Sequence, residues 1–281
     1  MIQNFVVLLA LFLGSITDFK KHEVPDTLNF SLIAIGLLLN SLLSIFYFDS
    51  SYIVYSLFGL FVGFCIGALF YYSGQWGGGD AKMVMGIGAV LGFNPFFLDS
   101  SLPMFLVFII SSLIIGALYG LVWLVIMAFL NRKIFLKKYR FFASKKPRWV
   151  LFLFLFVFLF LILALAFGFD FRLFVILFIF SLLLFFLYYF GVLLKAVEES
   201  SLIKKIKVSN LVEGDWVIDE FVFDNKPFAI GKTGISSSEI ELLKNKGVSE
   251  VKVKEGIPFI PSFFITYVLL LIFGNWLVLF F

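Results

Sequence analysis

The chain has 281 residues, of which 62% are hydrophobic and only 14% are charged, and its formal net charge is +4. Soluble domains are about 45–50% apolar and about 25% charged, so this composition excludes a soluble globular enzyme and a disordered chain. A mean hydropathy of +1.09 indicates a protein that crosses a membrane several times.

Eight apolar stretches are candidate spans, so we expect an all-α polytopic membrane protein with about eight transmembrane helices. They cover about residues 2–17, 27–47, 52–73, 82–98, 102–130, 149–169, 171–194 and 258–281. The first stretch has no basic residue before it and no A-x-A-like cleavage site, which favours a retained helix over a removed signal peptide. A turn at Gly168–Asp170 separates the sixth and seventh spans.

The basic residues predict the orientation. Twenty of the 22 Lys and Arg residues fall in three connections, at 18–26, 131–148 and 195–257. Alternating crossings place these connections on one side of the membrane, which the positive-inside rule makes the cytoplasm. We therefore expect a multi-pass protein of the cell membrane, with its N-terminus outside.

The predicted organisation has five parts. A core of five helices covers 1–130, a basic cytoplasmic loop 131–148, a peripheral hairpin 149–194, a small α+β cytoplasmic domain 195–256 and the last helix 257–281. In the α+β domain, β-forming residues predict strands at Val208–Glu213, Trp216–Phe223 and Val248–Val253. The spacing of Ser236 and Glu239 predicts a capping box at the start of a short helix.

Glycines recur every four residues on three consecutive spans. The positions are Gly59, Gly63 and Gly67, then Gly88 and Gly92, then Gly116 and Gly120. Small residues at this spacing let helix backbones approach closely in a membrane. The tight core, and with it the function, is therefore expected in spans one to five, whereas the Phe- and Leu-rich hairpin 149–194 should face lipid.

Two aspartates are the candidate catalytic residues. Asp18 ends the first span and Asp80 opens the fourth, so span parity places both at the cytoplasmic boundary. Two carboxyl groups that share a site favour different protonation states, because two like charges are costly together. The ionised carboxylate can then take a proton from water while the protonated one polarises a peptide carbonyl.

Gly77, Gly78 and Gly79 precede Asp80 and are expected to form an active-site loop that turns sharply and leaves room for an extended substrate. Purely structural roles stay open for both acids. Asp80 could cap a helix, and Asp18 could anchor the first helix at the membrane interface beside Lys20 and Lys21. Lys82 can influence Asp80 electrostatically or simply reach the membrane interface.

Gly77-Gly78-Gly79-Asp80 fits a GxGD motif, and the stretch from Gly79 to Gly92 resembles the type IV prepilin peptidases, above all the archaeal prepilin and preflagellin enzymes (class III signal peptidases). Pro25 and Asp26, which follow Asp18, and the segment Ile257–Pro261 are similar to further elements of that family. The resemblance implies that Asp18 and Asp80 are the catalytic pair of an aspartyl endopeptidase. It would cut a short basic leader from pilin-like or archaellin precursors on the cytoplasmic side.

The chain departs from the bacterial members of this family. It has one cysteine, Cys65, and therefore lacks their tetracysteine insert, and it carries a long insertion at 131–256. Both features argue against an N-methyltransferase activity. With one histidine, His22, and no glycine-rich cofactor fingerprint, we expect no metal and no cofactor. The basic charge reflects membrane topology, so no nucleic-acid partner is expected.

Glu23 and Asp26 are acids that could attract a basic leader, and with Lys82 they complete the candidate substrate-binding residues. For Glu23 a solvated surface charge is the simpler interpretation, and Asp26 could equally cap the second helix. A different functional class, a transporter or channel with cation- or proton-binding acids, also fits the spans. The 195–256 domain could recruit substrates or a secretion ATPase, although scaffolding of the last helix is the simpler role.

Overall fold

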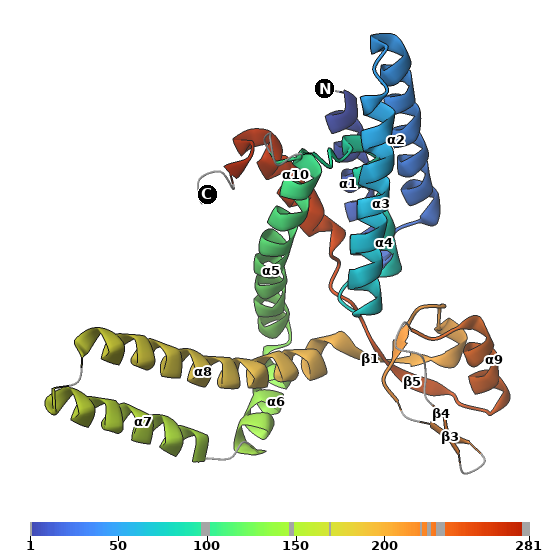
Figure 1. Cartoon of the computed structure of the whole chain (residues 1–281). Helices are drawn as coiled ribbons and strands as arrows, with labels where there is room; N and C mark the ends of the chain where they lie inside the picture. Colours follow the sequence, from blue (N-terminus) through green and yellow to red (C-terminus); the bar gives the residue numbers. More distant parts are fainter. Residues whose placement is uncertain are drawn as a thin grey trace. The chain divides into compact units, whose positions relative to one another are not determined.

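The computed structural model describes residues 2–96, 102–145, 149–168, 170–219, 221–223, 226–228 and 234–276. The chain is mostly helical (Figure 1). The membrane-type helices are α1 (Ile2–Lys21), α2 (Asp26–Tyr47), α3 (Ser51–Tyr72), α4 (Gly78–Leu91), α5 (Met104–Leu130), α7 (Trp149–Ala166), α8 (Phe171–Val197) and α10 (Ile260–Phe273). Two compact units emerge, residues 1–123 with 205–281, and residues 124–204.

Five helical stretches of the described chain are long and apolar enough to cross a membrane. They are α1, α2, α3, α5 and the stretch Phe171–Leu202, and a sixth results if α6 and α7 are counted as one span. The apolar helix α10 has 14 residues and is shorter than a full crossing. A multi-span helical protein with a small sheet is thus confirmed, whereas the number of eight spans stays a prediction.

The stretch 131–148, predicted as a basic loop, is helical over α6 (Arg132–Lys145). Lys, Arg, Leu and Ala favour helix, and no Gly or Pro interrupts them before Pro147. Lys138 Nζ lies 2.8 Å from Glu199 Oε2, in the π-helical turn η2 (Glu198–Leu202) that follows α8. The turn predicted at Gly168 is confirmed, since this glycine has a φ of +90° and the Asp170 side chain caps α8.

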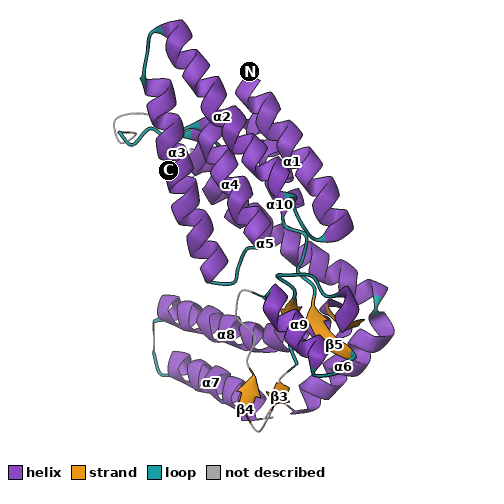
Figure 2. Cartoon of the chain, turned by 90° about the vertical axis from the view of Figure 1, so that its right-hand side faces the viewer, coloured by secondary structure: helices purple, strands orange, loops and turns teal. Residues whose placement is uncertain are grey.

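The short α+β segment before α10 has its own apolar cluster. Strands β1 (Ile203–Lys207), β5 (Glu250–Lys254) and β2 (Trp216–Val217) form a sheet in the order β1-β5-β2, and β3 (Phe221–Phe223) pairs with β4 (Lys226–Phe228). Helix α9 (Ser237–Asn245) begins at the predicted capping box of Ser236 and Glu239. Figure 2 shows the strands in orange.

Two strand predictions in this segment were wrong in detail. Val208–Asn210 forms a 3-10 turn instead of opening a strand, because Ser209 and Asn210 disfavour β structure while Val208 turns into the apolar cluster. The strand expected over 216–223 is interrupted near Asp219, whose carboxylate accepts the backbone N–H of Lys252 at 2.6 Å. The predicted strand at 248–253 is confirmed as β5.

Helix α4 is the most enclosed helix of the unit that contains the candidate acids. Helices α1, α2 and α3 lie against it (Figures 1 and 2). Its buried residues are Ala81, Met83, Val84, Gly86, Ile87, Gly88, Ala89 and Val90. They join side chains of α1, α5 and α10 in one apolar cluster, so the position of α4 follows from contacts on several sides.

The predicted glycine faces explain how closely α3 approaches α4. A Cβ placed on Gly59 would overlap the carbonyl group of Gly88, and one on Gly63 would lie 2.9 Å from the Val84 carbonyl oxygen. A Cβ on Gly67 would lie 2.9 Å from the carbonyl oxygen of Ala81. Only glycine permits this backbone-to-backbone contact. On α5, Gly116 packs against the Phe259 ring, but Gly120 has no neighbour within 4 Å among the described residues.

The C-terminal end of α4 is satisfied by polar side chains of neighbouring helices. With 14 residues, α4 is about 21 Å long and too short for a bilayer core of about 30 Å. Its last carbonyls would lack partners in hydrocarbon. Asn40 Nδ2 donates to the carbonyls of Ala89 and Val90 at 3.1 Å, and Gln3 Nε2 donates to Val90 and to Asn40 Oδ1.

The glycine contact between α3 and α4 can be tested with two matched substitutions. Gly59→Ala should lower the melting temperature of the purified protein in detergent, because inserting a methyl group into a close-packed contact costs about 1–3 kcal/mol. Gly120→Ala should leave it unchanged or raise it, since alanine is favoured over glycine in a helix by about 1 kcal/mol. Equal melting temperatures for the two variants would contradict the assigned contact.

Candidate active site

Asp18 lies in the last turn of α1 and is 5% exposed. Its Oδ2 accepts the backbone N–H of Ile260, the first residue of α10, at 3.0 Å. The first N–H groups of a helix have no partner within the helix, and a carboxylate there is favoured by the helix dipole. The segment 257–261, which drew attention as a sequence motif, thus presents a backbone donor to Asp18.

Asp80 lies in the first turn of α4 and is partly buried. Its Oδ2 accepts the backbone N–H of Gly77 at 2.9 Å, so the carboxylate stands at the start of α4 much as Asp18 stands at the start of α10. The two carboxyl groups are close enough to interact electrostatically. Helices α1 and α4, which carry these two acids 62 positions apart in the sequence, pack against each other.

The three glycines before Asp80 are not the sharply turned loop that was predicted. Helix α4 already begins at Gly78, and Gly77 precedes it in an ordinary extended conformation. None of the three has positive φ, which occurs instead at Gly74, with a φ of +71°. What requires glycine is space: a Cβ on Gly79 would lie 3.0 Å from the Cβ of Val24, whereas one on Gly78 would make ordinary contact with Tyr71 at 3.7 Å.

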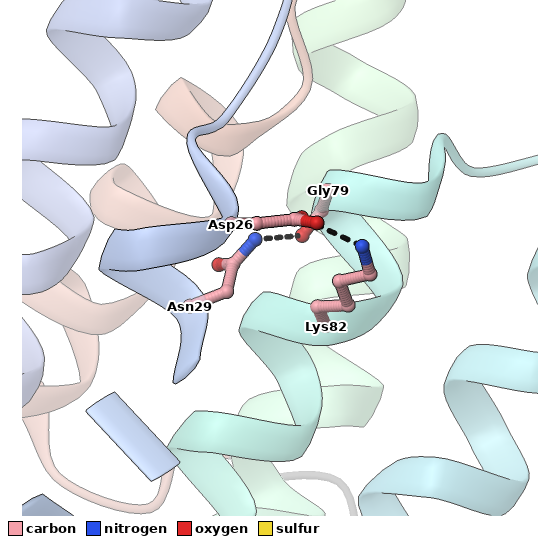
Figure 3. A network of polar contacts seen from close by, with 4 residues as sticks. All are labelled: Asp26, Asn29, Gly79 and Lys82. Atoms are coloured by element: carbon pink, nitrogen blue, oxygen red, sulfur yellow. Dashed lines mark hydrogen bonds and ion pairs between the residues drawn. The ribbon is translucent and has the colours of Figure 1, made fainter. Parts of the chain in front are cut away.

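Side chains from the start of α2 bind the start of α4 (Figure 3). Asn29 Nδ2 donates to the carbonyl oxygen of Gly79 at 3.3 Å, and Lys82 Nζ lies 2.6 Å from Asp26 Oδ1. The candidate residues Asp26 and Lys82 therefore pair with each other across two helices. Asp26 does not cap α2, because Pro25 occupies the N-cap and no side chain bonds there. Glu23 is exposed in the connection between α1 and α2.

Asn29 was missed by the sequence analysis. It is fully buried, and its Oδ1 has no hydrogen-bond partner among the described residues. A single signal could have found it, namely an amide side chain in the first turns of an otherwise apolar span, where a polar group is costly unless it is bonded. Its position beside Gly79 links the α2 start to the residue before Asp80.

Trp76 was also missed and connects the starts of α4 and α10. Its ring stacks on Phe70 with centroids 4.4 Å apart, and it meets the rings of Phe263 and Phe259 at 5.3 Å and 6.1 Å. Trp76 is 4% exposed. Because Phe259 directly precedes the donor of Asp18 while Trp76 directly precedes the donor of Asp80, this aromatic cluster holds both donors in place.

The chemistry open to this arrangement is that of carboxyl groups. Among the described residues, no three His, Cys, Asp or Glu side chains lie together in a way that could hold a metal ion. The single cysteine, Cys65, is exposed on α3. Two neighbouring carboxyl groups, each bonded to a backbone N–H at a helix start, are what a site for acid–base activation of water needs.

Comparison with known proteins covers the part of the chain that holds both acids. Residues 5–121 match the model of the type IV leader peptidase family. The preflagellin peptidase of Methanocaldococcus jannaschii is 37% identical over 89 residues, which are 31% of this chain and 38% of that protein. The prepilin peptidase EppA of Methanothermobacter thermautotrophicus is 28% identical over 140 residues (46% and 36%), and the preflagellin peptidase of Methanococcus voltae 36% over 102 residues (36% and 43%).

The chain thus spans less than half the length of each of these relatives. The matched segment includes Asp18, Asp80 and the helices α1 to α4 that position them. Residues 5–121, which include both carboxyl groups of the candidate site, are similar to the type IV leader peptidase family.

Proposed function

We propose that this protein is a membrane-embedded aspartyl endopeptidase that removes the leader peptide from pilin-like or archaellin precursors. The observation that carries the proposal is the approach of Asp18 and Asp80, each at a helix start, within the segment that matches the leader peptidase family. The names of the relatives, preflagellin and prepilin peptidase, indicate the substrate class.

The proposed reaction is a direct attack of water on the scissile carbonyl. The ionised carboxylate of the pair takes a proton from water, and the protonated one donates to the carbonyl oxygen, so a tetrahedral intermediate forms without an acyl-enzyme. A covalent route would need an activated Ser or Cys. The single cysteine, Cys65, is exposed on α3, and the chain has one histidine, His22, so at most one Ser–His or Cys–His arrangement could form.

The substrate's orientation follows from the charge pattern. Asp18 lies at the end of α1 and Asp80 at the start of α4, so both acids are expected on the same side of the membrane as the basic connection at 18–26. The positive-inside rule assigns that side to the cytoplasm. A basic leader would approach from that side, and Glu23 is the exposed acid nearest to Asp18 in sequence. Asp26 and Lys82 act differently in this proposal: their ion pair fixes the first turn of α4 against α2.

Asp18→Asn and Asp80→Asn should each lower the rate of precursor cleavage by about 10²–10⁴-fold, because either change removes an acid or base from the reaction. The measurement is the shortening of a purified prepilin or preflagellin in detergent or vesicles. Asp49→Asn, at an exposed aspartate that accepts the N–H of Ser51, is the matched control and should cleave normally. A well-folded Asp80→Asn enzyme with normal cleavage would end the aspartyl mechanism, whereas no cleavage by the unchanged protein would favour the transporter interpretation.

The two glycines at the start of α4 should respond differently to the same change. Gly79→Ala forces Val24 away from the residue before Asp80 and should reduce cleavage strongly, since the added Cβ has only 3.0 Å to its neighbour. Gly78→Ala adds a Cβ at ordinary contact distance and should retain most of the activity. Equal losses in the two variants would show that flexibility, and not space beside Val24, is what the site requires.

The ion pair between Asp26 and Lys82 predicts a non-additive cycle. Both side chains are partly exposed, at 60% and 36%, so the pair should be worth at most about 1 kcal/mol. Asp26→Asn and Lys82→Met should each slow cleavage by about two- to fivefold, and the double variant should be no slower than either. Additive effects, with a raised KM for a basic leader in Asp26→Asn, would instead assign Asp26 to leader binding.

A further inference from the structure

Tyr119, in the middle of α5, carries a buried hydroxyl group without an obvious structural purpose. The oxygen has no hydrogen-bond partner among the described residues. Buried polar groups are nearly always bonded, and an unsatisfied one in a native structure calls for an explanation. The hydroxyl of Tyr267, a fully buried tyrosine on α10, differs because it donates to Asn4 Oδ1 at 3.1 Å.

The neighbours of Tyr119 on α5 place it beside Asp18. Gly116, one turn earlier, packs on the ring of Phe259, where a Cβ would lie only 2.6 Å away. Phe259 directly precedes Ile260, whose N–H binds Asp18. Trp123, one turn later, meets the ring of Phe19 with centroids 6.0 Å apart, and Phe19 directly follows Asp18.

Residues three and four positions apart lie on one face of a helix. Tyr119 therefore stands between two contacts that reach the chain on either side of Asp18. Its ring packs against Trp123 with centroids 6.0 Å apart, which limits how it can rotate. The hydroxyl also interacts electrostatically with the Asp18 carboxyl group, in agreement with the contacts on the two sides.

We propose that Tyr119 is a positioning residue for Asp18: its hydroxyl donates a hydrogen bond to the Asp18 carboxylate, directly or through the attacking water, once a precursor has closed the site. The inference rests on the proposed peptidase function. An O–H donor bonded to a carboxylate favours its ionised form. Tyr119 would thereby join the Ile260 N–H as a donor to Asp18, which becomes the base, and leave Asp80 as the acid.

The test compares Tyr119→Phe with Tyr267→Phe in the full-length protein. For Tyr119→Phe we expect kcat for precursor cleavage to fall roughly ten- to hundredfold, the loss of one hydrogen bond to a charged group, with KM within about twofold. Its melting temperature should stay the same or rise, because the removed hydroxyl has no hydrogen-bond partner among the residues that the structure describes. Tyr267→Phe loses its bond to Asn4 and should show the reverse, a lower melting temperature with normal kcat per folded enzyme.

Normal kcat in Tyr119→Phe would overturn the inference, as would a change confined to KM, which belongs to substrate binding. A melting temperature that falls together with kcat per folded enzyme would assign Tyr119 a packing role and also overturn it. Asp18→Asn and Asp80→Asn, assayed in parallel, separate the two proposals. If they are inactive while Tyr119→Phe is normal, only the role of Tyr119 fails; if they cleave normally, the peptidase mechanism itself fails.

Discussion

The close contact between α3 and α4 is the constraint on which the rest of this unit depends. Glycines at 59, 63 and 67 let the backbone of α3 lie directly on that of α4, which encloses a helix too short to span a bilayer. An enclosed short helix needs polar partners at both ends. Asn40 and Gln3 supply them at its C-terminus, and Asp80 supplies one at its N-terminus. Asp80 is therefore held at the start of α4 by the same packing that makes this short helix possible.

The two candidate acids are bound in the same way, each by a backbone N–H group at the start of a helix. Each stands at the first turn of a helix and accepts a backbone N–H, from Gly77 for Asp80 and from Ile260 for Asp18. A helix start stabilises a negative charge without a basic side chain, so neither acid needs a salt bridge in a largely apolar setting. The Trp76 cluster joins the two helix starts, and Tyr119 approaches Asp18 from α5.

Much of the candidate site could be predicted because it rests on local patterns. Asp18 and Asp80 were identified as acids at the ends of apolar runs, and the glycine spacing predicted close helix packing among spans one to five without naming the pair that makes it. Gly79 was predicted to be required as a glycine because the chain turns sharply there. In the structure a side chain is disfavoured at this position because Val24, a residue 55 positions away, lies against it. Asn29 carried only the signal of an amide in an apolar span, and Trp76 and Tyr119 carried none beyond that of any aromatic residue. The helical α6 was missed because basic charge was interpreted as a connection, although Lys and Arg are good helix formers.

The sequence by itself determined that this is a multi-span helical membrane protein. It also determined which acidic residues lie at helix ends and which helix faces carry the small residues that allow close packing. These properties depend on composition and on periods of three to four residues, which any stretch of chain displays without its partners. Only the tertiary structure decided which helix start receives which carboxylate, that Asp26 pairs with Lys82, and that Gly116 and Trp123, on either side of Tyr119, contact Phe259 and Phe19 next to the Asp18 site. Such contacts join residues tens to hundreds of positions apart, and their geometry is set by how the helices pack rather than by the order of residues along any one of them.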